Sequence, residues 1–136
     1  MIKPINRDIF ILSKKSLPAS SSDLPTAADL LDTLKANSER CVGMAANMIG
    51  VNKRIIAFND EGEYVLMLNP EIIAKKDSYV TEEGCLSLDS VRSTKRYKTV
   101  KVKWQTTDFK TRIKTFSGFS AEIIQHEVDH LDGIII

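Results

Sequence analysis

The chain has 136 residues, of which 19 are basic and 18 acidic, so its formal net charge at neutral pH is +1. A chain of this length can bury one core, and we expect a single domain spanning residues 1–136. The balanced charge excludes the strong positive field that nucleic-acid binding needs. Lys3, Arg7 and Asp8 interrupt the first residues, which is not a signal-peptide pattern, and no apolar run reaches the length of a membrane span. We therefore expect a cytoplasmic protein that binds neither nucleic acid nor membranes.

The first quarter of the chain predicts an arm followed by one helix. Residues 1–25 contain a short apolar run and then a Ser/Pro-rich segment that is typical of a loop. Pro25 suits a helix start, and Leu30, Leu31 and Leu34 follow at helical spacing. The pattern predicts a helix from about residue 26 to residue 38, with its apolar face in the core.

The middle of the chain predicts strands. Two strand-like runs, 54–58 and 64–68, flank the turn-rich residues 59–62 and predict a hairpin, with Asn69-Pro70 ending its second strand. Alternating apolar and polar residues predict further strands over 99–104 and 111–116.

A helical pattern returns from Gly118, with Ser117 or Ser120 as a candidate cap. Strands bracketed by helices, without regular alternation, predict an α+β fold. In that fold, mostly antiparallel sheets pack around a central C-terminal helix, and one further helix lies near the N-terminus.

The predicted C-terminal helix contains both histidines of the chain, in Gln125-His-Glu-Val-Asp-His130. On a helix, His126 and His130 lie one turn apart on the same face, so both imidazoles can bind one metal ion beside Glu127. Such an ion lowers the pKa of a bound water, and the glutamate takes the proton as that water attacks. The motif predicts a hydrolytic metal site.

Other interpretations stay open on these residues alone. The two histidines could be buried and bonded to backbone groups, with Glu127 a solvated helix residue. A structural zinc would need four protein ligands, and Cys41 is then a candidate for the fourth. The many basic residues between 92 and 103 are most simply a solvated strand face.

A catalytic site of the zinc type needs a third protein ligand and one open position. Only Asp132 follows His130 as a possible ligand, so the third ligand is expected upstream, in Glu83-Gly-Cys-Leu-Ser87. Gly84 leaves room beside the thiol of Cys85, and a thiolate is a strong ligand for zinc or ferrous iron. The two cysteines stand in unlike contexts, which indicates a reducing compartment rather than a disulfide framework.

Three motifs in this order resemble those of the peptide deformylases, metallohydrolases that remove the N-formyl group from new polypeptides in bacteria and organelles. They are Gly43-Met-Ala-Ala46, Glu83-Gly-Cys-Leu-Ser87 and Gln125-His-Glu-Val-Asp-His130, and the likeness continues through Asn69-Pro70 and Leu131-Asp-Gly133. The resemblance implies three metal ligands: Cys85, His126 and His130. It also implies that Glu127 is the general base and acid, and that the backbone N–H of Leu86 contacts the formyl oxygen.

The same resemblance implies the reaction and its partners. N-formyl-methionyl peptides are hydrolysed to formate and a free amino terminus, as a step of protein biosynthesis. The implied metal is ferrous iron, with zinc or nickel able to replace it. The implied partners are nascent peptides, encountered near the ribosome.

The chain departs from the family's first motif, Gly-x-Gly-x-Ala-Ala-x-Gln, at two positions: Cys41 replaces the first glycine and Met48 the glutamine. A thioether cannot donate the hydrogen bond that an amide gives to the developing oxyanion, and one such donor is worth roughly 10²–10³ in turnover. Asn47 carries an amide, but in an extended segment it faces the other way. We expect reduced activity, with a non-catalytic metal- and peptide-binding protein as the alternative.

Three residues around this motif are candidate substrate contacts. Val42, Gly43 and Met48 would lie beside the metal, although Val42 and Met48 also suit a core and Gly43 also suits tight packing.

Overall fold

The computed structural model describes residues 1–85 and 88–135. In this part of the chain, five strands form one antiparallel sheet in the order β1 (Gly43–Ala45), β2 (Ile55–Asp60), β3 (Glu63–Cys85), β4 (Leu88–Gln105) and β5 (Thr111–Ser117). The helices are α1 (Ile9–Leu12), α2 (Leu24–Ala36) and α3 (Gly118–Leu131), with short 3₁₀ helices η1 (Ser21–Asp23) and η2 (Ala46–Ile49). The predicted α+β class is confirmed.

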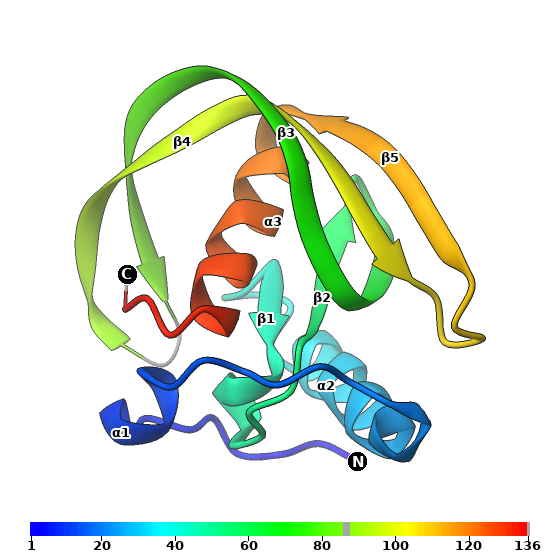
Figure 1. The fold of residues 1–136 in the computed structure, drawn as a ribbon. Coiled ribbons are helices and arrows are strands. Elements are labelled where there is room, and N and C mark those ends of the chain that lie inside the picture. The colour runs from blue at the N-terminus through cyan, green and yellow to red at the C-terminus, as the bar shows by residue number, and fades with distance from the viewer. Residues whose placement is uncertain (86–87, 136) are drawn as a thin grey trace.

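The long strands β3 and β4 curve over α3, and α2 lies on the opposite side of β1 and β2 (Figure 1). β2 is buried on both faces because its side chains alternate between two cores. Ile56 and Phe58 pack toward α3, whereas Ile55 and Ala57 pack toward α2. The C-terminal helix is therefore central, with the sheet wrapped around it.

The predicted hairpin is confirmed: β2 and β3 pair antiparallel from Ile55 with Leu68 to Asp60 with Glu63. Gly62 adopts a φ of +101°, which a glycine accepts without strain. Its N–H donates to the side chain of Asn59 at 2.7 Å, an interaction that closes the turn.

The predicted end of the second strand at Asn69-Pro70 is wrong, because β3 continues to Cys85. Asn69 instead has a positive φ of 52°, and the register against β4 shifts between Leu68 and Glu71. Asn69 exchanges two hydrogen bonds with the backbone of Ala19 and donates a third to Gln105. Pro70, which has no N–H for the ladder, is thus accommodated in a bulge that bends the strand rather than ending it.

The two predicted long helices are present with small shifts. α2 begins at Leu24 and ends at Ala36, two residues earlier than predicted at each end, and buries Leu30 and Leu34 completely. Ser117 occupies the N-cap position of α3, but its side chain makes no capping bond, while Ser120 lies inside the helix and donates to Asp60 at 2.6 Å. Within the described residues, no helix is both long and apolar enough to cross a membrane.

Candidate metal centre

Three predicted site residues meet at one point. The thiol of Cys85 and one ring nitrogen each from His126 and His130 lie within 4.8 Å of one another. Because metal–ligand bonds are about 2.0–2.3 Å long, one ion can span such a group. Both histidines are buried and the cysteine is partly buried.

The sequence produces this convergence through two elements. His126 and His130 are four residues apart on α3, so their rings lie on the same face and meet edge to face, with the two Nε2 atoms 3.0 Å apart. Cys85 is the last residue of β3, and β3 curves over α3 (Figure 1). The end of this strand therefore brings the thiol of Cys85 to the two histidines.

Glu83 orients His126. Its carboxylate accepts a hydrogen bond from Nδ1 of His126 at 2.7 Å, which leaves Nε2 facing Cys85 and His130. Metal-binding histidines are usually held in this way by a carboxylate on the other ring nitrogen. The carboxylate is itself held by Arg96, which chelates it through Nε and Nη2 at 3.0 and 2.7 Å.

Burial and hydrogen bonding act on the two imidazoles differently. Burial lowers the pKa of His130 to about 3. Burial also opposes charge on His126, but hydrogen bonds to Cys85 and Glu83 outweigh it and raise the pKa of His126 to about 10. Without metal, His126 is therefore the protonated, positively charged member of the pair at neutral pH and His130 is neutral. A metal ion must displace the extra proton of His126, since imidazole binds metals in its neutral form.

Glu127 is not a solvated helix residue, because its side chain is only 4% exposed. Burial raises the pKa of its carboxyl to about 7. Among the buried side chains that the structure describes, its Oε1 is one of three polar atoms without a hydrogen-bond partner. A buried carboxyl with a free oxygen and a pKa near neutrality is suited to accept and release a proton.

A cavity of about 260 Å³ brings these groups together. Cys85, His126 and Glu127 line it, and so do the three candidate substrate contacts, Val42, Gly43 and Met48. Phe119, which is 64% exposed, and Ile123 add an apolar wall from α3.

The 3₁₀ helix η2 corrects one expectation about Asn47. Residues 46–49 are helical rather than extended, yet the side chains of Asn47 and Met48 still diverge. Met48 lines the cavity, whereas the buried amide of Asn47 donates to the carbonyl of His130 at 2.8 Å. Asn47 thus supports the end of α3 and is not among the residues that line the cavity.

The structure also bears on the two remaining interpretations, histidines bonded to the backbone and Cys41 as a fourth zinc ligand. Among the residues that the structure describes, the ring nitrogens of His126 and His130 have partners in Glu83 and in each other, and none in backbone groups. Cys41 lines the same cavity but is not part of the convergent group, and its thiol donates to the carbonyl of Gly43 at 2.8 Å. The predicted contact of Leu86 lies outside the described residues.

Sequence reasoning missed the residues behind His126. The sequence showed Glu83 only as part of a motif, and it gave no role to Asp129. The interpretation of residues 92–103 as a solvated strand face is wrong for Arg96, which is 3% exposed and donates to Asp129 at 2.6 Å. One signal was available: Asp129, three residues after His126, must sit on the same helix near the metal face. Nothing in the sequence pairs it with an arginine from another strand.

A sheet wrapped around a helix with a His-Glu-x-x-His motif, completed by a thiol from a neighbouring strand, is the arrangement of a metallohydrolase. The family model described as Polypeptide deformylase matches residues 3–136. The chain belongs to the polypeptide deformylase family, which confirms the resemblance found in its motifs.

Individual relatives support the same family. The chain is 52% identical over 136 residues to the peptide deformylase of Clostridium beijerinckii, with complete coverage of both chains. It is 38% identical over 111 residues to that of Dictyoglomus thermophilum, covering 81% of this chain and 71% of the relative. A class I type b peptide deformylase from Acinetobacter baumannii superposes with a TM-score of 0.89 at 34% identity, covering 99% of this chain and 97% of the other. These relatives carry the names of enzymes, so the alternative of a non-catalytic binder is not favoured.

Proposed function

We propose that this chain hydrolyses N-formyl-methionyl peptides to formate and a free amino terminus. The observation that carries the proposal is the convergence of Cys85, His126 and His130 beside the buried Glu127 in one cavity. Membership of the deformylase family supports it. A structure of the Acinetobacter baumannii enzyme is described as bound to Met-Ala-Ser, the product such a reaction would leave; it matches with a TM-score of 0.89, 30% identity and coverage of 99% and 97%.

The donor set fits a divalent metal ion. One thiolate and two imidazoles suit ferrous iron, zinc and nickel, and we propose ferrous iron as the natural ion, held by Cys85, His126 and His130. A bound ion of this kind polarises a carbonyl oxygen and makes a water molecule acidic near neutral pH.

In the proposed reaction, Glu127 moves the proton. Its Oε1 takes a proton from the attacking water and delivers it to the amine nitrogen as the C–N bond breaks. The pKa of about 7 keeps both protonation states accessible at neutral pH. We propose that the backbone N–H of Leu86 supplies a donor to the formyl oxygen, and Met48 supplies none.

We propose that the cavity walls orient the substrate. Val42, which is 39% exposed, can contact the substrate's methionine side chain, while the Met48 side chain closes the inner wall. Gly43 also lines the cavity and can contact the bound peptide through its backbone. The full proposal is one catalytic domain over residues 1–136, acting in the cytoplasm on nascent peptides near the ribosome.

Release of formate tests this function. Anaerobically prepared, iron-loaded protein should release formate from formyl-Met-Ala-Ser, and Glu127→Gln should slow that release by about 10²–10⁴-fold while still binding one metal. Formate release no faster than that of metal-free protein would contradict the proposal. Equal rates for Glu127→Gln and the unmodified chain would instead remove the proton-transfer role from Glu127.

A further inference from the structure

A buried arginine stands behind the metal centre. Arg96 on β4 is only 3% exposed, and its guanidinium binds two carboxylates at once. Nε and Nη2 chelate Glu83 of β3, while Nη1 donates to Asp129 of α3 at 2.6 Å. One planar group therefore ties together three elements that meet at His126.

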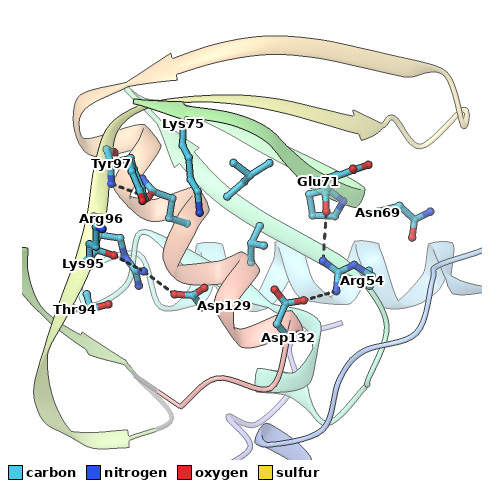
Figure 2. A pocket seen from close by; sticks show the side chains of 14 residues that line it. Arg54, Asn69, Glu71, Lys75, Thr94, Lys95, Arg96, Tyr97, Asp129 and Asp132 are labelled. Atoms are coloured by element: carbon cyan, nitrogen blue, oxygen red, sulfur yellow. Dashed lines mark hydrogen bonds and ion pairs between the residues drawn. The ribbon is translucent and has the colours of Figure 1, made fainter. Parts of the chain in front are cut away.

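Arg96 also borders a second, larger hollow of about 700 Å³ on the other side of α3. Figure 2 shows Arg96 and Asp129 joined across one part of this groove, and Arg54 and Asp132 joined across another. The Arg54–Asp132 pair, at 2.9 Å, is of the same chemical type and lines the same groove, yet neither partner bonds to Glu83. It offers an internal control.

We propose that Arg96, anchored by Asp129, is a positioning residue for the metal centre and acts through Glu83 on His126. A bidentate guanidinium fixes the plane of a carboxylate, which a point charge does not. With its plane fixed, Glu83 accepts from Nδ1 of His126 and directs Nε2 toward Cys85 and His130. The inference rests on the proposed metal site, and groups in this outer position typically alter metal affinity 10–100-fold.

Zinc affinity provides the first test. Arg96→Met should raise the zinc dissociation constant by about 10–100-fold, measured by competition with a chromophoric chelator. Arg96→Lys should fall between Arg96→Met and the unmodified chain, because an ammonium cannot chelate Glu83 and reach Asp129 together. Arg54→Met, which breaks the other ion pair of the groove, should leave zinc affinity unchanged.

Loss of Arg96 leaves the Glu83 carboxylate buried without its main partner, so a folding defect must be separated from a positioning defect. The double variant Glu83→Gln with Arg96→Met removes both charges and should recover much of the lost thermal stability. Its zinc affinity should stay weak, because a neutral amide that can rotate does not hold Nδ1 of His126 as firmly. Recovery of stability together with full zinc affinity would make Arg96 a purely structural residue.

The chain has only two histidines, and both belong to the proposed metal site. Every imidazole signal in a ¹⁵N NMR spectrum therefore comes from that site. In zinc-loaded protein, one imidazole N–H should be protected from exchange in the unmodified chain and in Arg54→Met. That protection should be lost in Arg96→Met and partly kept in Arg96→Lys. Unchanged affinity and unchanged protection in folded Arg96→Met would overturn the inference while leaving the metal site intact. Absence of tight zinc binding by the unmodified chain would instead count against the proposed function.

Discussion

The position of the Glu127 side chain requires a residue without a Cβ at position 43. A Cβ placed on Gly43 would lie 2.9 Å from Oε2 of Glu127 and 2.6 Å from a methyl carbon of Ile123. Both distances are shorter than real side chains accept, and both neighbours belong to the packed helix α3. Gly43 is therefore required by the close approach of β1 to α3, independently of any contact with substrate.

Gly43→Ala should consequently impair both stability and catalysis. Because Ile123 and Glu127 are both buried, the extra methyl group should cost about 1–3 kcal/mol of unfolding free energy and displace Glu127. Denaturant unfolding and formate release measure the two effects. Gly84→Ala is the matched control for stability, because its Cβ would meet Val91 at an ordinary 3.7 Å. Similar unfolding free energies for the two variants would argue against close packing at Gly43.

Met48 stands where a hydrogen-bond donor to the reacting oxygen is expected. Its side chain is buried at the cavity wall, and its sulfur lies 3.4 Å from the backbone N–H of Ala45. In Met48→Gln, the amide oxygen can accept from Ala45 while the amide nitrogen is left to donate into the cavity. Formate turnover should rise at least about 10-fold, and up to 10³-fold, as expected for one added oxyanion donor.

Met48→Leu is the control for this substitution, since leucine fills similar space and adds no donor; its turnover should match that of the unmodified chain. If Met48→Gln and Met48→Leu gave the same rate, the side chain at position 48 would not reach the reacting oxygen.

The sequence was most informative where chemistry and helical spacing coincide. His126 and His130 could be placed together because four residues make one turn, and Cys85 because few other ligands exist. Their surroundings could not be predicted. Arg96 lies in a run of basic residues that all look solvated, and only the curvature of β4 buries it against Glu83 and Asp129.

At the scale of elements, α3 borders the cavity with one face and the groove with another. One face presents His126 and Glu127 to the cavity. The other presents Asp129 to the groove, together with Asp132, which directly follows the helix. β3 and β4 close over both faces, and the Glu83–Arg96 pair joins these strands to the helix through His126 and Asp129. The pair should therefore stabilise the metal-free fold as well as the centre.

The pH dependence of Glu83→Gln tests that role in metal-free protein. Although burial opposes its charge, hydrogen bonds from His126 and Arg96 lower the pKa of Glu83 from 4.5 to about 2. A group whose pKa is lower in the folded state stabilises the fold above its unfolded pKa, and this contribution is lost as pH falls through the folded value. Glu83→Gln should thus cost about 3 kcal/mol at pH 7, where it breaks a buried pair.

The difference between the two proteins should stay nearly constant down to about pH 4.5 and shrink between there and about pH 2. Urea unfolding at a series of pH values measures it. A difference that persists undiminished at the acid end would mean that the charge of Glu83 is not what stabilises the junction.

Element boundaries show what local sequence can and cannot determine. The β2–β3 turn follows from Asn59 and Gly62 themselves, so the hairpin was predictable. The continuation of β3 through Asn69-Pro70 was not, because the partners of Asn69 are Ala19 and Gln105, 50 and 36 residues away in the sequence. Long-range partners converted an apparent strand end into a bulge.

At the scale of the whole molecule, the proposed metal links regions that are distant in sequence. Cys85 ends the long strand β3, while both histidines belong to the C-terminal helix. An ion held between them acts as a cross-link that exists only in the folded state. Because His126 carries an extra proton when no metal is bound, metal binding also releases that proton.

Metal binding should therefore raise thermal stability. An ion present at 100 times its dissociation constant adds about 2.7 kcal/mol, which for a chain of this size corresponds to a rise of roughly 10 °C in Tm. Scanning calorimetry with zinc and with excess chelator measures the shift. Cys85→Ala should lose most of the shift, because two imidazoles alone do not complete a tight site. Cys41→Ala should keep it in full, since Cys41 lies outside the convergent group even though it lines the same cavity. A shift that needs Cys41 as much as Cys85 would point to a closed, four-ligand structural site and would leave no position for a substrate.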